Sequence, residues 1–82
     1  MEPINLAVLD FNSVTVSLYT ISPDEFRAIS DEIGEEDEET VVLEYMDRKG
    51  HRESECNWMY SNRSIEVYVD PEFVDDANIF TD

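Results

Sequence analysis

Residues 22–50 read SPDEFRAISDEIGEEDEETVVLEYMDRKG, and the first four letters of this stretch predict the start of a helix. The Ser22 hydroxyl can accept a hydrogen bond from the amide of Glu25, whose carboxylate can reach back to the amide of Ser22. Pro23 suits the first position of a helix, because its missing amide hydrogen would have no partner there. Three apolar side chains then repeat at helical spacing: Phe26, Ile29 and Ile33. We therefore predict a helix over residues 23–33.

A second helix is predicted around the acidic run EEDEE at residues 35–39. Gly34 suits the left-handed residue that ends a helix. Asp37 suits the N-cap of the next helix, where free amides and the helix dipole favour negative charge, and Glu35 and Glu36 then form the turn between the two. Four apolar residues follow at helical spacing: Val41, Val42, Tyr45 and Met46. This pattern predicts a helix over residues 38–49, and the competing interpretation is a strand over TVVLEYM that turns at DRKG.

The segments on either side of this helical pair alternate as strands do. Residues 4–21 predict a hairpin that turns at Asn12-Ser13, because asparagine tolerates left-handed conformations. Residues 55–70 predict a second hairpin that turns near residues 61–63. Residues 71–82 form a tail whose structure the sequence leaves open.

The predicted fold is therefore a single acidic α+β domain over residues 1–82, with the order ββααββ. We expect an antiparallel sheet of about four strands (two hairpins) with two helices packed on one face. The sheet is expected to present to the helices Val14, Val16, Ile65 and Val67. The helices are expected to contribute Phe26, Ile29, Ile33, Val42, Tyr45 and Met46.

The charge of the chain restricts its function more than any motif. Asp and Glu number 21 against 5 Lys and Arg, and the net charge is −16. Such a charge opposes folding by self-repulsion and attracts basic surfaces. It argues against direct binding to nucleic acid or to an anionic membrane, since both need a positive footprint. The sequence shows neither a signal peptide nor an apolar run of roughly 20 residues, so we expect a cytoplasmic protein.

Few residues offer catalytic or metal-binding chemistry. The single histidine and the single cysteine are His51 and Cys56. They flank a predicted loop-to-strand junction, where they would meet only by chance, and no third group is indicated to orient the histidine. We expect Cys56 to be a small buried residue, and His51 to be either a residue of a surface loop or a partner of the helix dipole. Cysteine-based zinc binding would need more ligands, and neither calcium loops nor phosphate loops are present. We therefore expect no enzyme, no cofactor and no metal.

Binding of another protein is the function class that remains. A domain of this length has a diameter of roughly 30 Å, and B-DNA of that length carries about 18 phosphate charges. The sharpest hypothesis is a nucleic-acid mimic that inhibits a basic nucleic-acid-binding protein, with carboxylates that pair with Lys and Arg. The alternative is an adaptor or immunity-type protein that binds through an apolar patch, with its charge serving solubility. The candidate contact residues are Asp31, Glu32, Glu35, Glu36, Asp37, Glu38, Glu39, Asp75 and Asp76, with Trp58 and Tyr60 as aromatic anchors.

Overall fold

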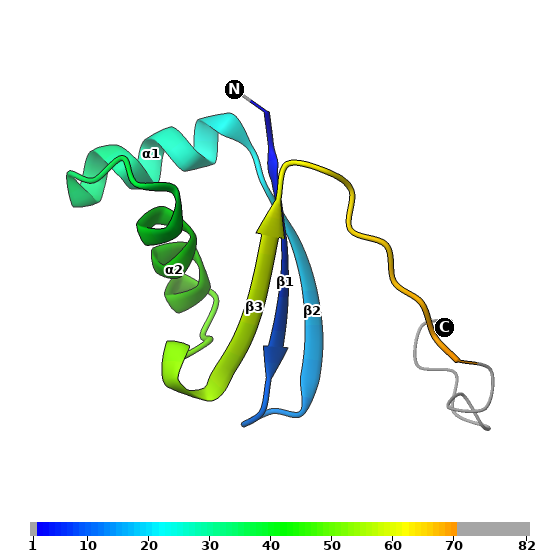
Figure 1. Ribbon diagram of the computed structural model, residues 1–82. Helices are drawn as coiled ribbons and strands as arrows, with labels where there is room; N and C mark the ends of the chain where they lie inside the picture. Colours follow the sequence, from blue (N-terminus) through cyan, green and yellow to red (C-terminus); the bar gives the residue numbers. More distant parts are fainter. Residues whose placement is uncertain (1, 71–82) are drawn as a thin grey trace.

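The computed structural model describes residues 2–70, and its elements follow the order ββααβ (Figure 1). The strands are β1 (Ile4–Asp10), β2 (Thr15–Ile21) and β3 (Cys56–Ser61). The helices are α1 (Pro23–Ile33) and α2 (Glu38–Arg48), and a short 3-10 turn, η1 (Glu53–Glu55), leads into β3. The sheet has the order β2-β1-β3, and both strand pairs are antiparallel. Within this part of the chain, no helix combines the length and the apolar character needed to cross a membrane.

Both helices begin where the sequence predicts; α1 also ends as predicted, and α2 ends at Arg48, one residue before the predicted end. The Ser22 hydroxyl accepts from the amide of Glu25 at 3.1 Å, and the Glu25 carboxylate accepts from the amide of Ser22 at 3.2 Å. Gly34 ends α1 with φ of 72°, in the left-handed region that glycine tolerates best. At the start of α2, the Asp37 carboxylate accepts from the amide of Thr40 at 3.1 Å. The prediction of a helix here is confirmed, and the strand alternative over TVVLEYM is wrong.

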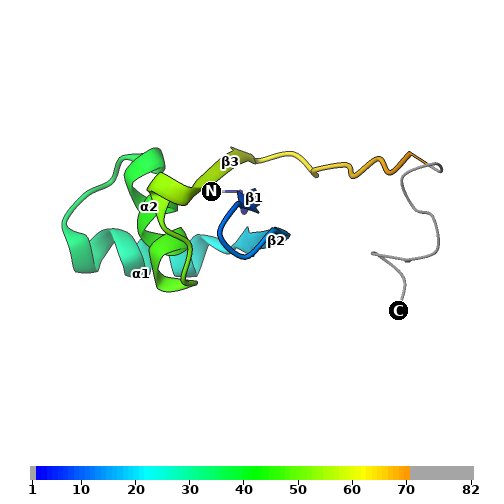
Figure 2. The ribbon, with the colours of Figure 1, turned by 90° about the horizontal axis from the view of Figure 1, so that it is seen from below.

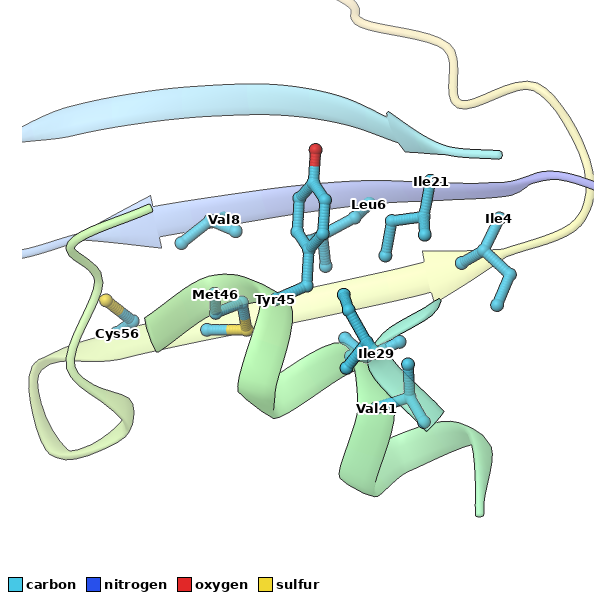
Figure 3. Close-up of a cluster of buried hydrophobic side chains, with 10 residues drawn as sticks. Ile4, Leu6, Val8, Ile21, Ile29, Val41, Tyr45, Met46 and Cys56 are labelled. Carbon is cyan, nitrogen blue, oxygen red and sulfur yellow. The ribbon is translucent and has the colours of Figure 1, made fainter. Parts of the chain in front are cut away.

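The core lies between the sheet and the two helices, which cover the same face of the sheet (Figures 1 and 2). The side chains of this core are at most 6% exposed. They come from every layer of the fold, as Figure 3 shows, and comprise Ile4, Leu6, Val8, Ile21, Ile29, Val41, Val42, Tyr45, Met46 and Cys56. Burial of such side chains stabilises a fold by roughly 1.5–3 kcal/mol each, so these contacts oppose the self-repulsion of the charge.

The face that β2 turns toward the helices is the opposite of the predicted one. Ile4 of β1 pairs with Ile21, and Leu6 pairs with Tyr19. Partners that lie directly opposite each other share a face of the sheet, so Tyr19 and Ile21 face the helices. The prediction that Val14 and Val16 pack under the helices is therefore wrong. It failed because β1 is apolar on both faces, so the hydrophobic pattern alone does not decide which face the helices cover.

The turn of the first hairpin is centred where predicted and is wider than predicted. It comprises residues 11–14 instead of Asn12-Ser13 alone. The Asp10 carboxylate accepts from the amides of Asn12 and Ser13 at 2.9 and 3.1 Å, which holds this wider turn in place. Val14, its last residue, adopts φ of 57° and is 86% exposed.

The second predicted hairpin is confirmed only in its first strand. β3 pairs with the free edge of β1, and residues 64–70 form no strand in the part of the chain that the structure describes. Ile65 is half-buried and Val67 is 48% exposed, so neither takes the predicted place under the helices. After β3 the chain leaves the sheet on the side away from the helices (Figures 1 and 2). The sheet described has three strands rather than four, and the predicted tail at residues 71–82 lies outside the described residues.

We predict that Val14→Gly stabilises the protein. A left-handed conformation costs an L-residue roughly 1–2 kcal/mol, and a β-branched side chain lies at the upper end. Glycine removes that strain but adds an entropic cost of roughly 0.5–1 kcal/mol, so the free energy of unfolding should rise by about 0.5–1 kcal/mol in urea titrations.

Val16→Gly is the matched control, because Val16 is also exposed but lies inside β2 with ordinary strand geometry. It should lower the free energy of unfolding by about 1 kcal/mol. Equal destabilisation by both substitutions would contradict the left-handed strain at Val14.

Candidate functional site

The face of the sheet away from the helices is largely apolar and exposed. We define the outer sheet face by the side chains that the strand registers place there: Asn5, Ala7, Leu9, Val16, Leu18, Thr20, Asn57, Met59 and Ser61. Its large apolar members are about half exposed, at 42% for Leu9, 55% for Val16, 50% for Leu18 and 55% for Met59. Phe11 and Val14 extend this surface into the adjoining turn, at 60% and 86% exposed.

The outer sheet face carries no charged side chain, although the chain has a net charge of −16. The three strands contain a single charged residue, Asp10, which is buried on the helix side at 7% exposed. An antiparallel sheet with one solvated face normally presents polar residues there. A contiguous apolar surface on an otherwise acidic protein is typical of an interaction site.

The predicted acidic contact residues lie in the helical layer. Asp31 and Glu32 belong to the second half of α1, and residues 35–39 form the connection to α2 and its first turn; all seven are exposed. Arg48 neutralises part of this layer through ion pairs of 2.6 Å with Glu32 and 2.9 Å with Glu44. The run at residues 35–39 forms no ion pair with any described side chain, so its negative charge faces solvent unneutralised.

The remaining predicted contact residues do not join either surface. Trp58 and Tyr60 are half-buried and pack against the core from the helix side of β3. Burial raises the pKa of Tyr60, and the carboxylates of residues 37–39 raise it further, which places its ring near the start of α2. Asp75 and Asp76 lie outside the described residues.

A buried polar cluster lies at the opposite end of the core, and we define it as Asp10, Tyr19, His51 and Cys56. His51 Nδ1 lies 2.8 Å from the carboxylate oxygen Oδ2 of Asp10, and His51 Nε2 lies 2.7 Å from the hydroxyl of Tyr19. One ligand-type atom from each of Asp10, His51 and Cys56 lies within 4.8 Å of the others. These three residues are 7%, 8% and 6% exposed.

The fold builds this cluster from four segments: the end of β1, strand β2, the loop after α2 and the start of β3. Asp10 ends β1 and pairs directly with Cys56, the first residue of β3. His51 follows α2, and its amide donates to the carbonyl of Met46 at 2.9 Å, which turns the loop back toward the sheet. The prediction that His51 lies on the surface is wrong. His51 and Cys56 do come together, although the sequence indicated that they would meet only by chance, and Asp10 is the third group that orients the histidine. The prediction that Cys56 is buried is confirmed.

The electrostatics of the cluster favour an ionised Asp10 and a protonated thiol. The hydrogen bond from His51, with a smaller contribution from the amide of Ser13, lowers the pKa of Asp10 from 3.8 to about 2. Burial raises the pKa of Cys56, and the negative charge of Asp10 adds to that effect. The histidine is held between Asp10 and Tyr19 rather than against the sulfur, so the cluster does not activate Cys56 as a nucleophile.

Two signals in the sequence could have located the cluster. Asp10 is the one charged residue at the end of an otherwise uncharged apolar strand, which is unusual unless the charge has a buried partner. The sole histidine follows a helix end directly, where a reversing chain brings it back to the sheet. Neither signal identifies Tyr19, whose role depends on the register of β2.

No family model matches this chain, and no curated protein or solved structure is significantly similar to it. Three features of the described residues bear on its function: the outer sheet face, the acidic helical layer and the buried polar cluster.

We predict that protonation of Asp10 lowers the free energy of unfolding of the protein in acid. Its folded pKa of about 2 lies below the ordinary value of 3.8. Asp10 therefore contributes stability in full above the unfolded pKa, and this contribution is lost as the pH falls through the folded pKa. The measurement is made with a chelator, so that no metal ion contributes. The difference in free energy of unfolding between the wild type and Asp10→Asn should shrink progressively from about pH 5 to about pH 2.

Asp31→Asn is the control, because Asp31 is an exposed carboxylate on α1. Its difference from the wild type should stay nearly constant over the same pH range. Comparing differences removes the general relief of self-repulsion that all carboxylates undergo in acid. A pH-independent difference for Asp10→Asn would contradict the ionised, hydrogen-bonded state of Asp10.

Proposed function

We propose that this chain is a non-catalytic protein-binding module whose partner docks on the outer sheet face. The observation that carries the proposal is the contiguous set of half-exposed apolar side chains at Leu9, Val16, Leu18 and Met59. Exposing such side chains gains the fold nothing, whereas covering them with a partner removes apolar surface from water.

The charge of the chain indicates the chemistry of the partner. A second copy would bring two bodies of net charge −16 together, and this repulsion disfavours self-association. A partner with an apolar contact surface and a net positive charge fits both properties, since the net charge of −16 attracts it and the outer sheet face holds it. The acidic layer lies on the other side of the sheet and the Debye length at physiological salt is about 8 Å, so the charge acts mainly on the approach of the partner rather than on the docked contact.

The turn beside the outer sheet face supports the same proposal. Val14 is strained at φ of 57° and 86% exposed, so neither backbone preference nor packing in the free protein favours a valine there. Phe11 is 60% exposed in the same turn. Contact with a partner would bury Phe11 and Val14 and so account for apolar side chains at these two exposed positions.

Nucleic-acid mimicry is the second candidate, and the unneutralised run at residues 35–39 favours it. A mimic would place these carboxylates against the Lys and Arg residues that otherwise hold phosphates. In that case the acidic layer supplies the affinity, and binding weakens steeply as salt rises. If the partner instead docks on the outer sheet face, salt should affect mainly the association rate.

Two double variants separate the candidates. Val16→Thr with Leu18→Thr makes the outer sheet face polar while keeping residues suited to a strand. Glu35→Gln with Glu36→Gln removes two exposed charges and no contact between described side chains. Each variant and the wild type are used to capture proteins from a lysate of the source cell, and any captured partner is purified and its affinity measured at about 0.1 M and about 0.5 M salt.

The proposal predicts a purified partner that binds the wild type at both salt concentrations. Its affinity should fall at least roughly tenfold for the threonine variant and less than roughly threefold for the glutamine variant. The reverse order, with binding lost at high salt, would establish mimicry instead. Truncation after Asp70 is a third arm: a free chain that binds the partner more tightly without residues 71–82 would show that the tail occupies the face.

A further inference from the structure

We propose that Asp10, His51 and Cys56 bind a thiophilic divalent transition-metal ion of the Zn²⁺ class. The three residues supply one carboxylate oxygen, one imidazole nitrogen and one sulfur, and these atoms lie within 4.8 Å of one another. The inference is independent of the proposed docking face, because the cluster lies on the helix side of the sheet and the docking face lies on the other.

The separations need only small movements to become a coordination sphere. Zinc–ligand bonds of about 2.0–2.3 Å in a tetrahedral site place the ligand atoms roughly 3.2–3.7 Å apart. The Asp10–His51 contact of 2.8 Å would open by about half an ångström to admit the ion, and the sulfur would approach. Side-chain rotations of this size do not require the strands to move.

The groups around these ligands are already placed as a metal site requires. The second oxygen of Asp10 accepts from the amides of Asn12 and Ser13, which fixes the carboxylate. The second ring nitrogen of His51 meets the Tyr19 hydroxyl at 2.7 Å, which orients the imidazole with Nδ1 toward the cluster. Ligands oriented by such outer hydrogen bonds are the usual arrangement in metal sites.

Charge and donor type select the class of ion. Binding displaces the thiol proton of Cys56, which is released as the ion enters. The His51 proton moves from Nδ1 to Nε2, where it is donated to the Tyr19 hydroxyl, so that the Nδ1 lone pair is free for the ion. A carboxylate and a thiolate then neutralise a divalent cation in a buried site, where an unpaired charge would be costly. Sulfur and imidazole donors suit Zn²⁺ and its neighbours, whereas Mg²⁺ and Ca²⁺ prefer oxygen ligands. Three protein ligands leave a fourth position for a water molecule.

The bound ion would join the end of β1, the loop after α2 and the start of β3. It would therefore stabilise the fold through contacts between segments far apart in the sequence, and its position under the helices keeps it away from the acidic run at residues 35–39. The distance from the acidic run distinguishes this site from weak cation binding by surface carboxylates.

Cobalt titration of the full chain tests the proposal. The protein carries no histidine tag and is prepared with a chelator and a reductant, which are then removed. Co²⁺ should bind at one equivalent, with a thiolate-to-cobalt charge-transfer band and visible bands of a four-coordinate site. Excess Zn²⁺ should abolish these bands and raise the Tm by roughly 10 °C at about 100-fold excess over Kd.

Three variants locate the ion. Cys56→Ser should remove the charge-transfer band and weaken binding by at least roughly tenfold. Tyr19→Phe should keep the band and weaken binding by about tenfold, because it removes only the outer hydrogen bond. Glu36→Gln should leave both the band and the affinity unchanged, and circular dichroism checks that each variant is folded.

If a variant fails to fold, alkylation of Cys56 in the wild type tests the proposal without any substitution. Cys56 is the sole thiol of the chain, so the reaction reports on this site alone. One equivalent of Zn²⁺ should slow the reaction at least roughly tenfold, and Mg²⁺ should not. Weak multiple binding without a charge-transfer band, together with unchanged thiol reactivity, would overturn the proposal and assign any bound ion to the acidic surface.

Discussion

The central position of β1 is the constraint on which the other parts of the structure depend. This strand pairs with β2 on one edge and with β3 on the other, and its inward side chains are nearly inaccessible to solvent. Because Ile4, Leu6 and Val8 must face the helices, the register obliges Tyr19 and Ile21 to do the same. The same alternation leaves Leu9 exposed on the far side, where Val16 lies opposite it. The central position of β1 and the alternation of its side chains thus produce both the core and the outer sheet face.

The end of this strand also explains the buried polar cluster. Asp10 continues the inward series of Ile4, Leu6 and Val8, so a carboxylate arrives where an apolar side chain would otherwise lie. Such a charge is tolerable only with hydrogen-bond partners, and it has them from His51 and from two amides of the turn. His51 in turn contacts Tyr19, and no buried polar side-chain atom of the described residues is left without a partner. A single strand therefore determines the core, the outer surface and the polar cluster.

Local chemistry made the helices predictable, and long-range pairing made the rest hard to predict. The capping box at Ser22 and the cap at Asp37 act within three or four residues, so sequence alone identifies them. The face of β2 depends on which side of an evenly apolar strand the helices choose, and that choice lies outside any local pattern. Residues 65–69 alternate as a strand does, yet they pair with neither of the two free edges of the sheet, those of β2 and β3. The meeting of Asp10, His51 and Cys56 required the register of β3 and the loop after α2 together, which no spacing in the sequence encodes.

We infer that the outer sheet face is open in the free protein and available to a partner. The most direct measurement is methyl NMR of the full chain with a soluble paramagnetic probe that broadens solvent-exposed groups. The account predicts strong broadening for the methyl groups of Leu9, Val16, Leu18 and Met59, and little for those of Ile4, Leu6 and Val8. Equal protection of both sets at low protein concentration would contradict the account, because it would mean that the chain already covers this face itself.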